Sequence, residues 1–386
     1  MVRVRLILKI ALIAIIQLIN IGCSKNDEPA EIKKGRRKGE KEISVQVDST
    51  TIKAMEKLPV FHGRTITVSI CGVDSRLNDN IHHADANHVL RCWLDEGAIE
   101  IIDIPRDTYA DAGLGGDLNN LANLRANRGR DAYLKKIASV IGAKNIDYYV
   151  ELGFSQAQGL LELVGQKDDA ATTLRVLRSR QGFDAGDYQR VYNQGIFMRK
   201  ILLNHFGKAT GWFRDPMLRA AIVLTETNIP LDTMKMIIDV LEEKGFPGNN
   251  QCYVHIMPKY NYKLAAYDFT DKSVLQKMNE RIDQRLRWDG VEVGKLKAGD
   301  YEQRLGELIA KAEQQKHPKN AISLLQRAYT QRAWMQITNT SLRADYAKRI
   351  CLLLITCYTK IDKKDEALKV LSFYEEQKDV LDGGLF

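Results

Sequence analysis

One polar stretch, Leu174–Gln194, holds the side chains best suited to chemistry, and it reads LRVLRSRQGFDAGDYQRVYNQ. Four charged side chains and one amide are regularly spaced in it: Arg178, Arg180, Asp187, Arg190 and Gln194. The first two are two positions apart, so they point the same way in an extended segment, and the last three align along one stripe of a helix. Arginine grips phosphate oxygens through a planar, permanently charged fork. We therefore predict that arginines from a strand end and from a helix converge on a phosphate; the alternative is a surface helix with ordinary Asp–Arg pairs.

Two carboxylates are expected at the edge of a predicted sheet. Asp74 follows the strand Thr65–Cys71, and Asp85 precedes the strand His88–Leu94. Two carboxylates without an obligatory His or Cys partner suit Mg²⁺, which prefers oxygen ligands and keeps waters for a phosphate. Two readings remain open beside it. The pair can be solvated loop aspartates, or nearby histidines can complete a transition-metal site: His82, His83 and His88.

A third strand, Ala98–Ile104, follows a hairpin turn at Asp95–Gly97 and runs into Pro105. Proline ends ladder pairing, so Arg106 is expected at the mouth of the sheet. The sequence has no Gly-rich phosphate loop, no nucleophile elbow and no Cys/His cluster, so a covalent serine or cysteine mechanism has no support. Arginines with carboxylates instead fit phosphoryl transfer at a metal-bridged pyrophosphate.

Strands alternate with helices through most of the chain. Further strands are predicted at Asp147–Leu152 and Cys252–Met257. Asp187 is expected as the N-cap of a helix that runs to about Phe206. Other helices are predicted at Asn120–Val140, Ser155–Val164, Pro216–Leu224, Asp232–Lys244 and Thr270–Leu286. This alternation predicts a three-layer α/β/α domain with a central mixed sheet.

After about Trp288 the apolar periodicity is helical and no strand is expected. Helices are predicted at Ala321–Tyr329, Tyr346–Tyr358 and Asp365–Tyr374. The stretch from Tyr346 onward resembles a tetratricopeptide unit, with a plain helical bundle as the alternative.

The N-terminus has the pattern of an export signal. Basic residues precede the apolar run Ile10–Ile21, and Gly22–Cys23 follows as in a bacterial lipoprotein, where the Cys is lipidated. If cleavage fails, the run stays as a short membrane anchor. Residues 1–42 carry +5 of the total charge of +8, so the rest is close to neutral and no nucleic-acid-binding face is expected. The basic run Lys33–Lys41 is read as a solvated linker, or as a segment near anionic lipid.

Apart from Cys23, the chain has five cysteines: Cys71, Cys92, Cys252, Cys351 and Cys357. Their spacing matches no zinc pattern, and an odd number cannot all pair. We expect Cys71 and Cys92 as buried strand thiols, and Cys351 and Cys357 as core residues of a helix.

Five motifs occur in one order: GVDSR, ADAN, IPRDTY, DYYVELGF, and LRVLRSR with GDYQRVYNQ. Together, from about Arg64 to Leu203, they resemble the LytR–CpsA–Psr family (cell envelope-related transcriptional attenuator domain). The resemblance implies an extracytoplasmic, membrane-tethered enzyme that holds a polyprenyl-pyrophosphate-linked glycan, with its lipid in an apolar tunnel. Such an enzyme moves the glycan phosphate to peptidoglycan or to a protein.

The resemblance also implies roles for single residues. It implies that Asp74 and Asp85 are Mg²⁺ ligands. It also implies that Asp187 and Gln194 orient the arginines of the site; alternatively, Asp187 is the catalytic base. The arginines that it implies for pyrophosphate binding are Arg76, Arg106, Arg178, Arg180 and Arg190. The chain departs from the family at His83 and Asn193, where arginines are usual, and at Gln166–Asp168. A divergent donor or reduced activity is compatible with these departures.

We therefore expect four regions: a signal peptide or anchor (1–23), a charged linker (24–45), the α/β domain (46–290) and a TPR-like helical domain (291–386). The predicted function is a Mg²⁺-assisted glycopolymer phosphotransferase, lipid-anchored on the periplasmic face of a membrane. The alternatives are a non-catalytic envelope lipoprotein that binds lipid-linked precursors and recruits a protein partner through its C-terminal helices, and a polyprenyl-pyrophosphate phosphohydrolase.

Overall fold

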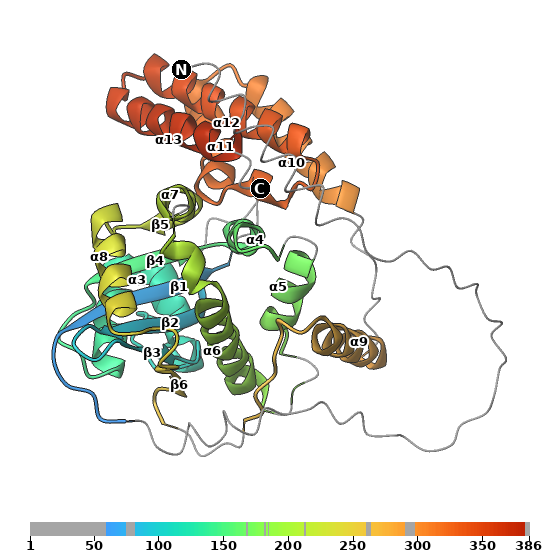
Figure 1. The fold of residues 1–386 in the computed structure, drawn as a ribbon. Coiled ribbons are helices and arrows are strands. Elements are labelled where there is room, and N and C mark those ends of the chain that lie inside the picture. The colour runs from blue at the N-terminus through green and yellow to red at the C-terminus, as the bar shows by residue number, and fades with distance from the viewer. Residues whose placement is uncertain are drawn as a thin grey trace, which may run out of the picture. The chain divides into compact units, whose positions relative to one another are not determined.

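The computed structural model describes residues 59–74, 82–166, 169–180, 183, 185–211, 214–259, 264–289 and 298–382. All of them belong to one compact unit, Val45–Phe386. They form a mixed six-stranded sheet in the order β5-β4-β1-β2-β3-β6 (Figure 1). The strands are β1 Thr65–Val73, β2 Ala84–Trp93, β3 Ala98–Asp103, β4 Tyr148–Leu152, β5 Glu226–Thr227 and β6 Cys252–Ile256.

The five predicted strands are confirmed, with ends that differ by a few residues from the sequence pattern. β-Branched residues in β1 and β3 supply the stiff surface that a sheet needs, and all residues of β3 are buried. The predicted hairpin joins β2 to β3 in an antiparallel pair from His88↔Asp103 to Trp93↔Ala98. Gly97 has φ +65°, a conformation that few residues other than glycine adopt, so it closes the turn.

The sheet is covered by helices on both faces (Figure 1). On one face, Cys71, Val89 and Ile102 pack against Leu121, Tyr133 and Ile137 of α3. On the other face, side chains of β3 and β6 pack against α6 and α8. The prediction of a three-layer α/β/α domain is therefore confirmed. These helices are α3 Leu121–Val140, α4 Phe154–Leu163, α5 Ala170–Arg178, α6 Gly186–His205, α7 Arg214–Leu224, α8 Leu231–Glu243 and α9 Lys272–Trp288.

The expectation that Arg178 and Arg180 follow a strand is wrong. Residues Ala170–Arg178 form helix α5, and Arg180 follows it in an irregular segment. Leu174 and Leu177 on α5 pack in one apolar cluster with Leu275 and Ile282 of α9. The two helices are far apart in the sequence. Their packing favours a helix at Ala170–Arg178, where the local sequence pattern is ambiguous. The N-cap of α6 is Ala185, so Asp187 stands inside the first helical turn.

The C-terminal part is helical, as predicted, with one helix more than expected. Its helices are α10 Ala298–Glu313, α11 Pro318–Thr330, α12 Thr340–Lys360 and α13 Lys364–Asp382, with a 3₁₀ turn, η4, at Ala333–Gln336. They share a core built around Trp334, Ile350 and Leu354, which also takes in Val223 and Leu224 of α7. The C-terminal helices therefore complete a core that the α/β domain begins. Whether they are TPR-like stays a prediction.

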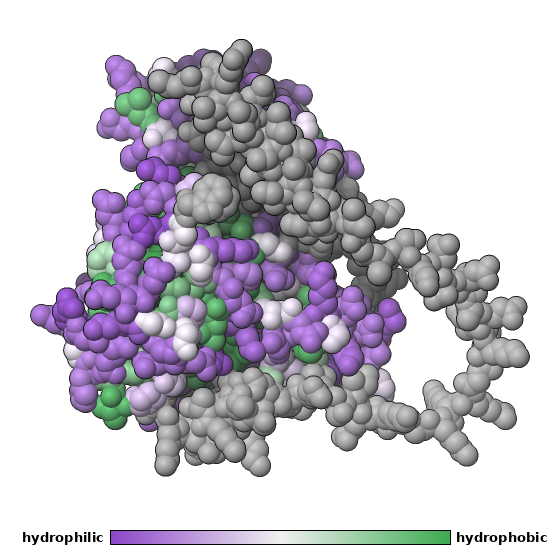
Figure 2. Space-filling view, viewed as in Figure 1, coloured by the Kyte–Doolittle hydropathy of each residue, from purple (hydrophilic) through white to green (hydrophobic). Residues whose placement is uncertain are grey.

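A buried ion pair joins the two parts. Arg343 of α12 binds Glu162 of α4 through Nη1–Oε2 (2.8 Å) and Nη2–Oε1 (3.2 Å), and both side chains are at most 3% exposed. The same guanidinium donates from Nε to the carbonyl of Ile337. Hydrophilic residues cover most of the surface seen in Figure 2, as expected when the apolar side chains serve these cores.

The five cysteines beyond Cys23 are buried and free, which confirms the expectation for Cys71, Cys92, Cys351 and Cys357. In the part of the chain that the structure describes, no helix combines the length and the apolar character that a membrane crossing requires. Cys23, the linker and the predicted boundary at 290/291 lie outside the described residues.

Candidate functional site

Several strand ends meet at one edge of the sheet. β1 is parallel to β4 and antiparallel to β2, and β3 is parallel to β6 and antiparallel to β2. The C-terminal ends of β1, β3, β4 and β6 therefore share an edge with the start of β2. At this edge Gly72 pairs with Ala86 but Val73 pairs with Ala84, so Asp85 is an extra residue on β2. Such a β-bulge re-aims a side chain, and bulges are frequent beside active sites.

Five of the predicted site residues are joined here by ion pairs, and we call them the arginine–aspartate cluster: Asp85, Arg106, Arg180, Asp187 and Arg190. Arg106 Nη1 lies 2.6 Å from Asp85 Oδ1. Arg190 Nη2 lies 2.6 Å from Asp187 Oδ1 and donates to the Asp85 carbonyl at 3.1 Å. Arg180 Nε lies 3.3 Å from Asp187 Oδ1. The bulge of β2, the segment after β3 and the start of α6 are thus tied together.

The cluster holds polar atoms that the described residues do not satisfy. The Nε atoms of Arg106 and Arg190 and both carboxylate oxygens of Asp187 are buried without an aligned hydrogen-bond partner in the described part of the chain. Buried polar groups almost always find a partner, so such atoms indicate a place for a ligand. Two guanidinium donors beside one carboxylate fit a phosphate that also presents a hydroxyl or a proton to Asp187.

Like charges are held close together in the cluster and its surroundings. Burial lowers the pKa of Arg190; Asp187 opposes this shift, and the charge of Arg106 adds to it. Burial raises the pKa of Asp107, and the neighbouring charge of Asp187 raises it further. Both shifts report charges held close together in a partly dry site. A phosphate between the guanidinium groups relieves the repulsion between Arg106 and Arg190.

One buried network beneath the cluster escaped the sequence analysis. His88 Nδ1 lies 2.7 Å from Asp103 Oδ1, and His88 Nε2 lies 3.2 Å from Gln194 Oε1. Gln194 Nε2 donates to the Leu177 carbonyl at 2.9 Å. Burial raises the pKa of Asp103 to about 6, although the hydrogen bond to His88 opposes that shift. Neighbouring strand positions bring His88 and Asp103 together, so only the register of β2 with β3 could have revealed the pair.

This network bears on the expectations for His88 and Gln194. Both ring nitrogens of His88 have partners within the protein, so the His/Asp metal site considered from the sequence does not include His88. Both polar atoms of the Gln194 amide are also engaged. Gln194 therefore connects α6 to the His88–Asp103 pair and to the end of α5, and its role in orienting the cluster stays a prediction.

Arg178 does not join the ion pairs of the cluster among the described contacts. Its guanidinium stacks over the Phe154 ring, 5.1 Å from the centroid. Arg178 is the last residue of α5 and Arg180 follows the helix in an irregular segment, so the extended segment assumed from their spacing is not present. Arg76 lies outside the described residues.

Asp74 stands at the same sheet edge as Asp85. Its amide donates to the His83 carbonyl at 2.9 Å, and its carbonyl accepts from Arg327 Nη2 at 3.0 Å. Among the described residues, no three His, Cys, Asp or Glu side chains gather closely enough to hold a metal ion by themselves. Two carboxylates at one edge suit a hard cation that takes its other ligands from water and a phosphate, so the donor set fits Mg²⁺ in that limited sense.

The fold and the cluster together define a three-layer α/β protein with a cluster of arginine and aspartate side chains at the edge of its sheet. The LytR_cpsA_psr family model matches residues 21–166, so the family resemblance is confirmed over that part of the chain. The matched region contains Asp74, Asp85 and Arg106, and it ends before α5 and α6. The arginines of α6 are therefore placed by the structure and not by the family match.

Several solved structures are similar to this chain. Bacillus subtilis TagV is 15% identical, with 58% of this chain and 98% of that chain covered at a TM-score of 0.40. The structure of TagT bound to LI-WTA is 16% identical, covers 60% of this chain and 95% of that chain, and has a TM-score of 0.39. The transcriptional regulator EF0465 from Enterococcus faecalis is 18% identical, with 60% of this chain and 89% of that chain covered at a TM-score of 0.41. No curated protein matches the sequence.

Proposed function

We propose that this protein is an extracytoplasmic glycopolymer phosphotransferase. It moves a glycan phosphate from a polyprenyl-pyrophosphate carrier to a hydroxyl of peptidoglycan or of a protein. The observation that supports the proposal is the arginine–aspartate cluster, whose ion-paired guanidinium and carboxylate groups meet at one sheet edge and include buried atoms without an aligned hydrogen-bond partner among the described residues. The family match over residues 21–166 supports the same class of reaction.

The reaction needs few groups from the protein. The acceptor oxygen forms a bond to the glycan-bearing phosphorus, the bridging P–O bond breaks, and polyprenyl phosphate leaves. Arg106 and Arg190 hold the phosphate oxygens through their unsatisfied donors, where charge stabilisation does most of the catalysis. Asp187 accepts the proton of the acceptor hydroxyl, since its oxygens have no aligned donor among the described residues.

Asp74 and Asp85 are the residues proposed to hold Mg²⁺. When bound, Mg²⁺ supplies positive charge that offsets the charge of the pyrophosphate. Asp85 already shares one oxygen with Arg106, so its carboxylate can link the cation to the arginines. We further propose that the N-terminal segment tethers the protein to a membrane through Cys23 or through the apolar run, which puts the cluster near a lipid-linked substrate.

The test uses the full-length protein in detergent with a polyprenyl-pyrophosphate oligosaccharide, Mg²⁺ and a peptidoglycan acceptor. Arg190→Lys and Arg106→Lys keep the charge but lose the fork, and we expect each to lower transfer about 100-fold, as loss of one positioned donor does. Arg64→Gln is the matched control, because Arg64 is 75% exposed and pairs with Asp95 at the opposite end of β1.

The products separate the proposal from its alternatives. A glycan phosphate on the acceptor supports transfer. Release of the glycan phosphate to water in the presence of acceptor indicates a phosphohydrolase. Tight binding of the carrier without either product indicates a non-catalytic lipoprotein. If Arg190→Lys and Arg64→Gln transfer glycan at the wild-type rate, the cluster is not the active site.

A further inference from the structure

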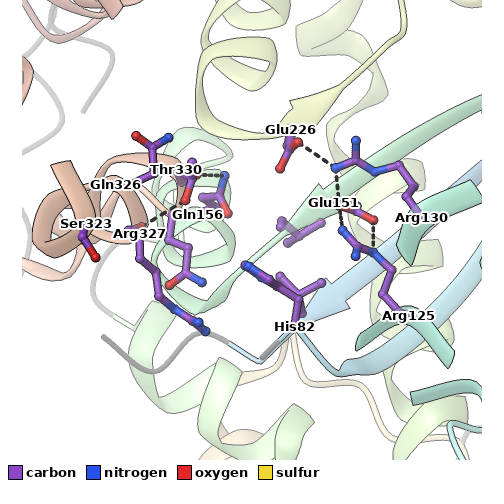
Figure 3. A pocket seen from close by; sticks show the side chains of 13 residues that line it. His82, Arg125, Arg130, Glu151, Gln156, Glu226, Ser323, Gln326, Arg327 and Thr330 are labelled. Carbon is purple, nitrogen blue, oxygen red and sulfur yellow. Dashed lines mark hydrogen bonds and ion pairs between the residues drawn. The ribbon is translucent and has the colours of Figure 1, made fainter. Parts of the chain in front are cut away.

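The buried carboxylates of the sheet differ in the partners that they have. Glu151 of β4 is 4% exposed and binds two guanidinium groups, those of Arg125 and Arg130 (Figure 3). Asp103 of β3 is fully buried, and among the described residues its only hydrogen-bond partner is the imidazole of His88, 2.7 Å away. A buried charge needs an opposite charge beside it. Asp103 therefore either lies beside a protonated His88 or holds a proton itself.

The hydrogen bonds around His88 fix where its protons are. Gln194 donates from Nε2 to the carbonyl of Leu177 at 2.9 Å, so its amide oxygen faces His88 Nε2, 3.2 Å away. An amide oxygen only accepts hydrogen bonds, and His88 Nε2 must therefore carry a hydrogen. In a neutral ring this leaves Nδ1 bare, opposite a carboxylate oxygen that also only accepts. A second proton must therefore lie in the 2.7 Å contact between Nδ1 and Asp103 Oδ1.

The pair thus holds two protons and has no net charge, whichever partner binds the second proton. An imidazolium beside a carboxylate and an imidazole beside a carboxylic acid are both neutral. Burial favours this neutral state, because loss of one proton would leave a negative charge in a dry site. Burial also raises the pKa of Asp103 to about 6, so its carboxyl keeps a proton more readily than that of an ordinary aspartate.

This arrangement connects the end of α5 to α6. The carbonyl of Leu177 belongs to the last turn of α5, where a helix leaves its carbonyls without a partner of its own. Gln194 of α6 supplies that partner. Shortly after the end of α5, Arg180 lies 3.3 Å from Asp187, which precedes Gln194 on α6 by two turns. The segment that ends α5 is therefore bound to α6 at two points, and the first of them depends on His88.

We propose that His88 and Asp103 are positioning residues of the arginine–aspartate cluster. Their shared proton keeps the Gln194 amide on the end of α5, and this contact keeps Arg180 against Asp187. Without the proton, His88 turns a bare nitrogen either to the amide oxygen or to the carboxylate, and two acceptors then face each other. The effect on catalysis rests on the proposed phosphotransferase function, because Asp187 is its proposed base. The arrangement of the protons does not rest on it.

Nitrogen-15 NMR of the full-length protein, labelled at its seven histidines, tests the arrangement without any substrate. The ring signals of His88 are those that His88→Gln removes. At neutral pH we expect His88 Nε2 to carry a hydrogen. In the common arrangement of a histidine beside an ionised aspartate, Nδ1 carries the hydrogen and Nε2 is bare. A bare Nε2 in the folded protein overturns the proposal.

Two substitutions of Asp103 separate the hydrogen bond from the charge. Asp103→Asn offers an amide that donates to Nδ1, so Nε2 keeps its hydrogen and its contact with Gln194. Asp103→Leu offers no partner. Hydrogen exchange of the amides of Leu174–Ser179 should accelerate at least about tenfold in Asp103→Leu, as loss of one hydrogen bond predicts, and should keep the wild-type rate in Asp103→Asn. Equal rates in the two variants refute the proposal; should Asp103→Leu not fold, the His88 signals alone decide.

The transfer assay supplies the catalytic readout. Asp103→Leu should lower kcat about tenfold and leave KM for the lipid-linked glycan close to the wild-type value, because Arg106 and Arg190 still bind the phosphate. Asp103→Asn should restore most of kcat. A wild-type kcat in Asp103→Leu refutes the positioning role. If the wild-type protein transfers no glycan, the proposed function fails, and the NMR and exchange results still decide this inference.

Discussion

The buried pair between Arg343 and Glu162 should control whether the C-terminal helices stay docked on α4. Neither side chain is more than 3% exposed, and the pair is bidentate. Removing one partner leaves an uncompensated charge in a dry interface, which costs about 3–5 kcal/mol. Replacing both residues by apolar residues of similar volume removes the attraction between the charges, but it also removes the cost of desolvating them. The free energy of unfolding should therefore change little. The single variants should therefore be much less stable than the double variant.

Urea unfolding of four variants measures this. Arg343→Met and Glu162→Leu should each lower the free energy of unfolding by about 3–5 kcal/mol, and the double variant should recover most of that loss. Arg349→Met on the same helix is the control, because its pair with Glu313 is 34% and 41% exposed and contributes about 1 kcal/mol or less. If the single variants match the control, the pair does not hold the interface. A double variant as unstable as the two singles combined refutes the desolvation argument.

Two further predictions concern the His88–Asp103 network. Burial raises the pKa of Asp103 to about 6, so its contribution to stability is complete below its ordinary pKa and is lost as pH rises through about 6. This loss is at most about 3 kcal/mol. In a plot of the urea midpoint against pH, Asp103→Asn should flatten this part of the curve. A profile that keeps its slope in the variant assigns the titration elsewhere. Gly195→Ala in α6 should destabilise the protein by about 1–3 kcal/mol, because an added Cβ would lie 2.2 Å from Asp103 Oδ2. An increase in thermal midpoint, the usual helical response to this substitution, would show that Asp103 can move aside.

Local patterns predicted the parts of the fold that local forces decide. The five strands were predictable because β-branched runs ended by turn residues have few other structures available. The stripe of α6 was predictable because Asp187 and Arg190 are three apart in a helix, and their ion pair follows from that spacing alone. Asp85 and Arg106 were placed at the sheet edge from strand ends, and the structure joins them at 2.6 Å.

Tertiary contacts decided the parts that the sequence analysis missed. Arg178 was assigned to an extended segment, yet α5 forms because its apolar side packs on α9, about a hundred residues later. The bulge at Asp85 depends on how β2 aligns with β1, which no pattern within β2 records. Asp103 was hidden in a strand of apolar residues, and its role depends on the register that puts His88 opposite it.

The position of Arg327 connects these observations. The arginine–aspartate cluster starts from the bulge of β2, and that bulge faces the end of β1, where Asp74 begins the loop to β2. Arg327 holds the Asp74 carbonyl from α11, and α11 belongs to the core that Arg343 docks on α4. This hydrogen bond therefore connects the docking of the C-terminal helices to Asp74. Loosening the Arg343–Glu162 pair should therefore disturb the position of Asp74 before it disturbs the arginine–aspartate cluster, because no cluster residue touches α11 in the described contacts.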